Sequence, residues 1–249
     1  MTDPRVRTTS PSTGGRLVYA VGDVHGYAHQ LRALLAEIRA DAARSRTAER
    51  PRLIFLGDYV DRGPDSLGAI EAILAAEAEP AFEVTALKGN HEDAMLRFLA
   101  EPGFAPAWIS NWGDATLRSY GVEPPRTDDP EACEAARARL AAALPDSHRA
   151  FLSRLTLTAR EGDYLFVHAG LRPGVALADQ AEHDLLWIRY EFLESEADFG
   201  CVVVHGHTLS ERPEVRENRI NVDTGVYFTG VLTAVRLEDG RREFLQSTA

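Results

Sequence analysis

The side chains of this sequence whose types and spacing could do chemistry are aspartates, histidines and an asparagine that directly follow short apolar runs. Because ligands bind beyond the carboxyl ends of strands in α/β sheets, we expect the loops that carry these residues to converge. Any one loop could be a simple turn or helix cap, but five in succession favour a site. The loops are GDVHG after residues 17–21, GDYVDRG after 53–56, GNHE after 84–87, HAG after 164–167 and HGHT after 202–204.

The donor types in these loops indicate a metal centre. Oxygen and nitrogen donors without thiolates favour a borderline to hard divalent cation such as Mn²⁺, Fe or Zn²⁺. Asp23 and His25, two residues apart, can reach one cation, and Asp58 could bridge that cation to a second. The second cation would be completed by Asn90, His168 and His207. Two neighbouring cations are an arrangement used to hydrolyse phosphoryl groups.

The composition limits the possible partners. The chain has 249 residues, a formal net charge of −11 and 45% hydrophobic side chains, which is typical of a globular protein. Its acidity disfavours nucleic acid and anionic membrane surfaces as partners, and an anionic substrate would need local cations. The two cysteines, Cys133 and Cys201, cannot form a disulfide framework, and no transmembrane or secretory segment is evident, so we expect a cytoplasmic protein.

The elements that must position these loops follow from the hydrophobic pattern. Residues 1–15 are polar, which predicts a flexible tail. Residues 16–249 are predicted to form one α/β domain. Strand, loop and helix alternate three times at first, which predicts parallel strands. The predicted helices of this half are 29–43, 66–78 and 92–100.

The second half of the chain has a different pattern of predicted helices and strands. Residues 101–125 interrupt the pattern with Pro, Gly and two Trp, and an insertion over about 101–154 carries predicted helices at 130–144 and 146–152. Closely spaced turns then indicate antiparallel or mixed pairing, with two sheets packed face to face as one arrangement. The predicted strands are 155–159, 164–167, 202–204, 220–222 and 231–237.

The ordered motifs resemble those of a known family. GDVHG, GDYVDRG, GNHE, HAG and the later GH are similar to the signature set of the phosphoprotein phosphatases within the calcineurin-like metallophosphoesterases. The resemblance spans about 18–235 and is strongest to the bacterial branch with the phage lambda-type Ser/Thr phosphatase, through LWIR (186–189) and NVDTG (221–225). It implies two mixed β-sheets packed as a sandwich flanked by helices, and a dinuclear centre that commonly holds Mn²⁺.

The resemblance also implies residue roles. His91 would be the general acid, oriented by Asp61, while Arg62 and Arg189, together with Asn90, would bind the phosphate. Hydroxide activated by the two cations would attack phosphorus in line with the leaving oxygen. His205 matches no ligand of this branch; at most it would support the metal ligands from behind, and a solvated, non-catalytic imidazole is the favoured interpretation.

Three functions remain open from the sequence. The first is hydrolysis of phosphomonoesters, with phosphoserine and phosphothreonine in proteins as the leading substrates. The second is hydrolysis of diadenosine polyphosphates, although Glu92 after GNH and the short span from His168 to His207 favour the phosphatase. The third is a non-catalytic phosphate-binding module, which would be supported by a missing ligand or acid.

Aromatic residues outside the motifs have weaker interpretations. Trp108, Ile109 and Trp112 fit packing of the insertion better than a substrate groove. Tyr227 and Phe228 could border the site or lie in a strand core. Substrate specificity would reside in 101–154.

Overall fold

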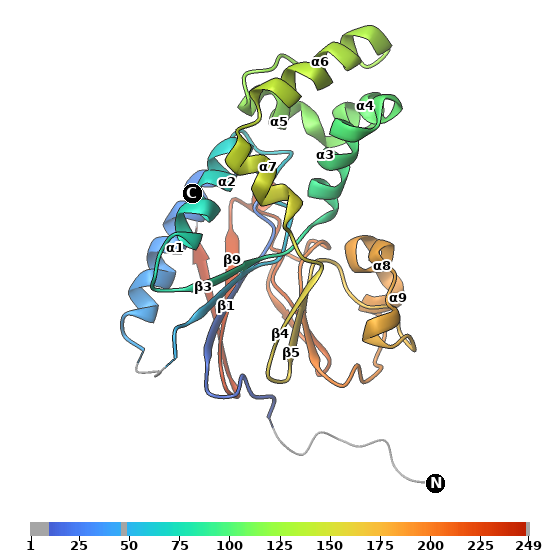
Figure 1. The fold of residues 1–249 in the computed structure, drawn as a ribbon. Helices are drawn as coiled ribbons and strands as arrows, with labels where there is room; N and C mark the ends of the chain where they lie inside the picture. Colours follow the sequence, from blue (N-terminus) through green and yellow to red (C-terminus); the bar gives the residue numbers. More distant parts are fainter. Residues whose placement is uncertain (1–9, 46–48, 248–249) are drawn as a thin grey trace.

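A computed structural model describes residues 10–45 and 49–247, which form two five-stranded sheets and their covering helices (Figure 1). The first sheet has the strand order β10-β9-β1-β2-β3, in which β1, β2 and β3 pair in parallel and β9 is antiparallel to both of its neighbours, β1 and β10. Its strands are β1 (Leu17–Val21), β2 (Arg52–Phe55), β3 (Glu83–Ala86), β9 (Leu232–Glu238) and β10 (Arg241–Ser247).

The second sheet is also mixed, as the sequence predicts. Its order is β4-β5-β6-β8-β7, with a parallel centre and an antiparallel strand at each edge. Its strands are β4 (Thr158–Glu161), β5 (Tyr164–Val167), β6 (Val202–His205), β7 (Glu214–Val215) and β8 (Arg219–Asn221).

The two sheets pack face to face through the apolar side chains of their central strands. In β1, Val18 and Ala20 join a buried cluster with Phe166 and Val204 of the second sheet. Alternate β1 residues, such as Tyr19, face the opposite side and pack in the cluster that includes α1. Because the central strands are buried on both faces, their sequences are continuous apolar runs.

Helices cover both outer faces and one end of this sandwich. Helices α1 (Ala28–Ala42) and α2 (Ser66–Glu77) pack with the first sheet, and α8 (Glu182–Trp187) and α9 (Tyr190–Leu193) with the second. Figure 1 shows α3 to α7 gathered at one end of the sheets. The elements of that end are α3 (Asn90–Ala100), the 3-10 helix η1 (Pro102–Phe104), α4 (Ala105–Trp108), the π-helical turn η2 (Ile109–Gly113), α5 (Asp114–Ser119), α6 (Pro130–Ala143) and α7 (Asp146–Ser153).

The structure differs from the predicted elements in several places. The strand predicted at 155–159 is observed as β4 at Thr158–Glu161, and β7, α8 and α9 were not predicted. Residues 101–125, expected to be irregular, contain η1, α4, η2 and α5, because several short helical turns follow one another too closely to show a periodicity. Strand β10 was not predicted because its run, RREFLQS, is mostly polar; it pairs along its length with β9. Two short helices, η3 (Leu177–Asp179) and α10 (Val226–Thr229), lie in loops.

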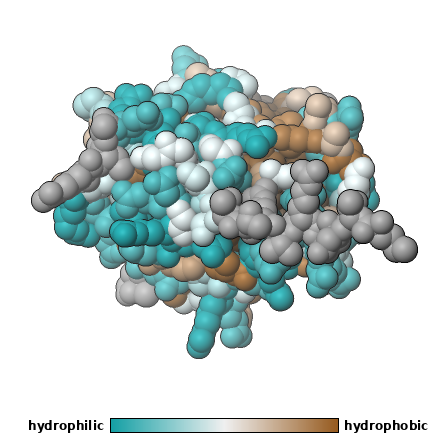
Figure 2. Space-filling model, turned by 90° about the horizontal axis from the view of Figure 1, so that it is seen from below, coloured by the Kyte–Doolittle hydropathy of each residue, from teal (hydrophilic) through white to brown (hydrophobic). Residues whose placement is uncertain are grey.

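The segment before β1 contacts both sheets where it is described. Residues 1–9 of the predicted tail lie outside the described residues. Ser12 N donates a hydrogen bond to Asp163 (2.9 Å), and Thr13 Oγ1 accepts one from Asp239 N (2.9 Å). The end of the molecule away from α3–α7 is mostly hydrophilic beside an apolar area (Figure 2). Among the described residues, none of the helices has the length and apolar character to cross a membrane.

Asp41 links α1 to the first sheet through hydrogen bonds, and its contribution to stability can be measured. Its carboxylate accepts hydrogen bonds from Tyr19 Oη (2.5 Å) and Arg236 Nε (2.8 Å). Burial acts to raise the pKa of Asp41, but these bonds outweigh it and leave the pKa below its usual value. The ionised form is therefore favoured on folding, and its contribution is lost as the pH falls through the lowered pKa.

Asp41→Asn should lower the free energy of unfolding by about 1–3 kcal/mol at pH 7, since bonds to a charged group are lost. The difference from the unaltered protein should shrink at a pH of about 3, where the carboxyl becomes protonated. Urea unfolding at pH 7 and at a pH of about 3 measures the free energy of unfolding of both proteins. Asp128→Asn, which removes an exposed ion pair with Arg126, is the matched control and should change little. An equal loss at both pH values would contradict the assigned role of the charge.

Candidate active site

The five loops converge where the carboxyl ends of strands from both sheets meet. Asp23 and His25 follow β1, and Asp58 follows β2. Asn90 and His91 begin α3 directly after β3 and its short loop. His168 follows β5, and His207 follows β6. These seven side chains are all buried, at 7% exposure or less.

Asp58 lies at the centre of this group. Its Oδ2 is 3.7 Å from Nε2 of His25, and its Oδ1 is 3.4 Å from Nε2 of His168. Two sets of potential metal ligands contain it, and in each set one ligand atom per residue lies within 4.8 Å of the others. The sets are His25, Asp58 and His91, and Asp58, His168 and His207. A carboxylate common to both sets is the arrangement expected for a bridging ligand.

Asn90 and Asp23 join the same group. Asn90 Oδ1 lies 2.9 Å from Nε2 of His168 and 2.8 Å from Nδ1 of His207. Both carboxylate oxygens of Asp23 accept from the backbone N–H of His207, at 3.1 and 3.2 Å. The structure thus brings together all six residues that the sequence analysis named as donors.

The donor chemistry fits divalent cations. Nδ1 of His168 lies 3.0 Å from the carbonyl oxygen of Leu56, which can only accept, so this nitrogen carries the proton. Its Nε2 therefore presents a lone pair to Asn90 Oδ1 and Asp58 Oδ1. The same holds for His25, whose Nδ1 donates to the carbonyl of Val60 (3.1 Å). Lone pairs that face one another without protons between them are stabilised by a cation.

The pKa values of the buried groups are also consistent with a bound cation. Burial raises the pKa of Asp58 and Asp23 well above the usual range, and neighbouring carboxylates add to the effect. Burial lowers the pKa of His168 to about 3 and lowers that of His25 strongly. The histidines are therefore neutral, as metal ligands must be, and a bound cation would favour ionised aspartates.

The backbone around the site is strained. Among the described residues, six other than glycine have positive φ, and five belong to this site. Such conformations persist where the surrounding structure enforces them, typically at functional sites. Gly89 and Gly206 keep space open, because a Cβ there would lie 2.2 Å from Asp58 Oδ1 and 2.1 Å from Asp23 Oδ1. The five residues are His25, Asp58, Asp61, Arg62 and His207.

Glu92 fixes the strained loop after β2, a role that sequence reasoning did not assign to it. Its carboxylate is fully buried and accepts from four backbone N–H groups at 2.7–3.2 Å. The position was visible in GNHE, but three of its four partners lie more than thirty residues away in sequence. The four donors are Asp58, Tyr59, Val60 and Gly89.

His91 and Asp61 form a buried pair beside the donors. Nδ1 of His91 is 2.8 Å from Oδ2 of Asp61, and its Nε2 is 3.8 Å from Asp58 Oδ2. Burial lowers the pKa of His91 to about 3 and raises the pKa of Asp61 to about 7. Because the two groups are in hydrogen-bond contact, a proton on the pair lies between His91 Nδ1 and Asp61 Oδ2. The arrangement can hold and orient a proton.

Two arginines face the same space. Arg62 and Arg189 line a cavity of about 140 Å³ together with His25, Asp58 and His91. Both side chains are exposed, and no ion pair to either is found among the described residues. Arg62 instead stacks over the ring of Tyr227, 4.5 Å from its centroid. Unpaired guanidinium groups beside a small polar cavity are suited to bind a phosphoryl group.

The walls of the cavity include residues that were predicted to have another role or none. Trp112 lines it, although packing of the insertion was the favoured interpretation; its ring lies 5.2 Å from that of His91. Trp187, Leu209 and Asp223 also line it and had no assigned role. Trp108 and Ile109 are buried, as predicted. Tyr227 borders the site, and Phe228 next to it is 75% exposed rather than in a core.

The expected solvated position of His205 is wrong. The side chain is fully buried, its Nδ1 lies 3.1 Å from the carbonyl oxygen of Gly206, and its ring packs against Phe192 at 5.0 Å. As the last residue of β6, it points away from the donor group toward α9. Burial lowers its pKa to about 4, so it is neutral.

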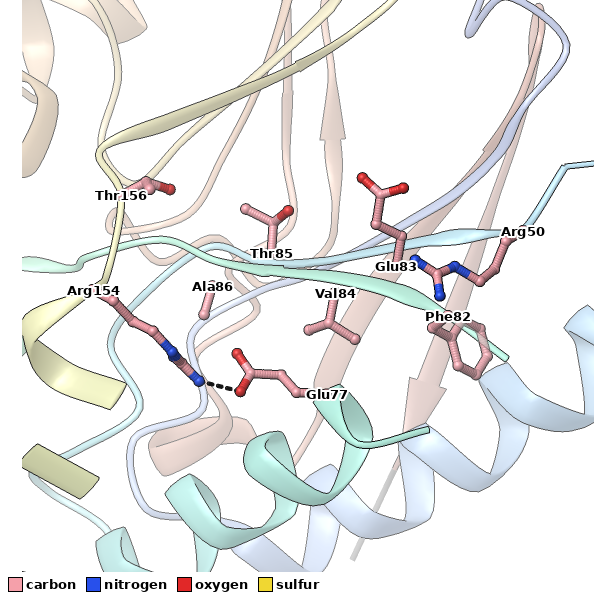
Figure 3. Close-up of a pocket in the computed structure, with 9 residues that line it drawn as sticks. All are labelled: Arg50, Glu77, Phe82, Glu83, Val84, Thr85, Ala86, Arg154 and Thr156. Atoms are coloured by element: carbon pink, nitrogen blue, oxygen red, sulfur yellow. Dashed lines mark hydrogen bonds and ion pairs between the residues drawn. The ribbon is translucent and has the colours of Figure 1, made fainter. Parts of the chain in front are cut away.

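A larger cavity of about 500 Å³ lies at edge strand β3 (Figure 3). Its charged groups are largely paired already: Glu77 and Arg154 point toward each other in Figure 3 and form an ion pair, and Glu83 bonds Arg16 at 2.6 Å. The nine lining residues include neither histidine nor cysteine. Its chemistry therefore does not compete with that of the smaller cavity.

A scan against protein-family models matches the calcineurin-like phosphoesterase family over residues 17–230. The match covers most of the chain and all the loops described above. The chain belongs to the calcineurin-like phosphoesterase family. This phosphoesterase has the two mixed sheets and helices of that fold, with His and Asp clusters able to bind metal ions.

Curated relatives of this phosphoesterase include two kinds of enzyme. Serine/threonine-protein phosphatase 1 of Salmonella typhimurium is 28% identical over 90% of this chain and 93% of that protein. The asymmetrical bis(5'-nucleosyl)-tetraphosphatase PrpE of Anoxybacillus flavithermus is 24% identical over 92% and 93%. Among solved structures, a Saccharomyces cerevisiae protein serine/threonine phosphatase superposes with a TM-score of 0.58 at 15% identity, covering 94% of this chain and 80% of that one. This last likeness concerns the fold alone.

Proposed function

We propose that this phosphoesterase hydrolyses phosphate monoesters, with phosphoserine and phosphothreonine in proteins as its leading substrates. One observation carries the proposal: two sets of potential metal ligands share Asp58 directly beside the His91–Asp61 pair and two unpaired arginines. Metal, acid and phosphate-binding groups thus surround one small cavity. A non-catalytic module would lack part of this set.

The residues proposed to hold the cations are Asp23, His25, Asp58, Asn90, His168 and His207. Bound divalent cations would supply a nucleophile at neutral pH and neutralise charge on the phosphoryl oxygens. Arg62 and Arg189, with Asn90, would orient the same oxygens, and preorganised charge of this kind is usually the largest catalytic contribution. His91 would deliver a proton from Nε2 to the departing oxygen, while Asp61 holds its Nδ1–H.

The cavity favours monoesters over dinucleotides. Its volume of about 140 Å³ matches a phosphoryl group and its nearest atoms, and two of its lining residues are cationic. The relatives nevertheless include a bis(5'-nucleosyl)-tetraphosphatase, so diadenosine polyphosphate hydrolysis is the alternative to test.

A substrate panel with added Mn²⁺ tests the proposal. We expect kcat/KM for a phosphoserine peptide and for p-nitrophenyl phosphate to exceed that for diadenosine tetraphosphate. A preference for the dinucleotide would overturn the monoesterase assignment in favour of the alternative. No turnover of any substrate by the Mn²⁺-loaded protein would instead support a binding module.

Three finer expectations also remain proposals. We propose Mn²⁺ as the resident metal, with Fe or Zn²⁺ as alternatives consistent with the same donors. We propose a cytoplasmic location, with which a chain of only two cysteines is consistent. We also propose that residues 16–249 act as one metallophosphoesterase domain, with its insertion at about 101–154.

Arg189→Ala should mainly weaken phosphate binding. Loss of a charge-assisted contact to the phosphoryl oxygens should raise KM and the inhibition constant of inorganic phosphate by roughly 10–100-fold. Steady-state kinetics with phosphate as inhibitor measures both values. Arg212→Ala, an exposed arginine outside the cavity lining, is the matched control. If both constants stay unchanged in Arg189→Ala, this arginine does not belong to the site.

A further inference from the structure

Asp61 receives hydrogen bonds from two side chains of the helical insertion. Thr116 Oγ1, on α5, donates to Asp61 Oδ1 at 2.7 Å. Trp108 Nε1, at the end of α4, donates to Asp61 Oδ2 at 3.1 Å, the same oxygen that faces His91 Nδ1. All three side chains, Asp61, Trp108 and Thr116, are fully buried. The carboxylate is therefore held at three points, and one of these is His91.

We propose that Trp108 and Thr116 are positioning residues that hold the Asp61–His91 pair in the geometry needed for proton delivery. The proposal rests on the proposed function, because it assigns these residues a part in the step that His91 performs. It gives the insertion a role in catalysis in addition to any role in specificity.

The backbone of Asp61 shows why such support is needed. Asp61 has φ +71°, a left-handed conformation that is uncommon in residues other than glycine and that clusters at functional sites. Its N–H donates to Thr116 Oγ1 (2.8 Å), so one hydroxyl holds both the main chain and the carboxylate of this residue. Without these bonds the carboxylate could rotate away from His91. An imidazole whose partner rotates loses its orientation and basicity.

The helical insertion places the side chains that bond Asp61 on one helical face. Trp108, Trp112 and Thr116 recur every four residues, the spacing that places side chains on one helical face. The π-helical turn η2 lies between the first and the last of them, and π-turns occur mostly at functional sites. The carbonyl of Trp112 accepts from Arg62 N (3.3 Å), which ties the turn to the phosphate-binding residue.

Space for the indole of Trp108 is also provided. A Cβ on Gly113 would lie 2.4 Å from two atoms of the Trp108 ring. On the opposite side the ring packs on Phe98, with centroids 4.3 Å apart. These contacts fix the direction of Nε1–H toward Asp61.

The test compares substrates that do and do not need a proton on the leaving oxygen. Thr116→Val removes the hydroxyl at nearly constant volume, Thr116→Ser retains it, and Trp108→Phe removes the indole N–H. We expect Thr116→Val and Trp108→Phe to lower kcat for a phosphoserine peptide by about 10-fold. Their kcat for p-nitrophenyl phosphate, whose leaving group departs without a proton, should change less than about 3-fold. Thr116→Ser should behave as the unaltered enzyme.

Tyr120→Phe is the matched control. It removes a buried hydroxyl of the same region, which bonds His148 at 2.8 Å and does not contact Asp61. We expect it to alter stability without altering the ratio of the two kcat values. If Thr116→Val or Trp108→Phe lowers both rates in parallel, as a general packing defect would, the proposal is overturned. Unchanged rates on both substrates overturn it as well. Should Trp108→Phe fail to fold, the comparison of Thr116→Val with Thr116→Ser decides.

His91→Asn on the same two substrates separates this inference from the proposed function. If His91→Asn leaves the ratio of rates unchanged, the acid assignment itself is wrong. If His91→Asn changes the ratio but the variants of Trp108 and Thr116 do not, only the positioning role is wrong.

Discussion

Asp58→Asn is expected to abolish both metal binding and turnover. Asp58 is common to both sets of potential ligands, so this single substitution removes a negative charge that serves two cations. Asparagine tolerates the left-handed backbone of this position (φ +54°), and the fold should therefore survive. We expect a decrease in kcat of at least about 10²-fold, together with loss of bound metal. Elemental analysis after desalting, alongside steady-state kinetics, measures both.

The matched control for Asp58→Asn is Asp239→Asn. Asp239 has a similar backbone conformation (φ +48°) but lies in the turn between β9 and β10. This variant should keep its metal and its activity. Full metal content in Asp58→Asn would contradict the shared role of the carboxylate, whatever the effect on the rate.

His91→Asn is expected to slow the chemical step while leaving the metal in place. His91 could itself be a ligand, since it is one of the three members of the first set. Its Nδ1 contact with Asp61 at 2.8 Å favours the role of acid instead. Loss of acid–base assistance should lower kcat for an alkyl phosphate by about 10²–10⁴-fold. The decrease for p-nitrophenyl phosphate should be much smaller.

The decisive measurement for His91→Asn is therefore metal content together with the two rates. His29→Asn, an exposed histidine near the start of α1, provides the control. A variant that loses metal would show that His91 is a ligand. Full activity on the alkyl phosphate would remove it from the mechanism altogether.

The strands that carry the site could be predicted from sequence because they are apolar on both faces. The run at 164–167 coincides with β5, and those at 53–56 and 84–87 lie one residue from β2 and β3. Strand β10 has no such signal, since its side chains are mostly polar and its place depends on pairing with β9. The helical turns of 101–125 are too short to show a period of 3.6 residues.

The convergence of the donors could be predicted because parallel strands end at a common edge. The hydrogen bonds that hold the donors and their neighbours in place could not be predicted. Glu92 reaches four backbone groups, and Trp108 and Thr116 reach Asp61 across 47 and 55 residues. Such contacts depend on the path of the insertion, which leaves no local pattern in the sequence. The burial of His205 likewise depends on the packing of α9 over the second sheet.

Anomalous diffraction from crystals grown with Mn²⁺ would show whether Asp58 binds two cations. We expect two peaks, each at about 2.0–2.3 Å from its donor atoms. Asp23, His25 and Asp58 should surround one peak, and Asp58, Asn90, His168 and His207 the other, with Asp58 contacting both. A single peak, or two peaks that do not share Asp58, would contradict the dinuclear centre.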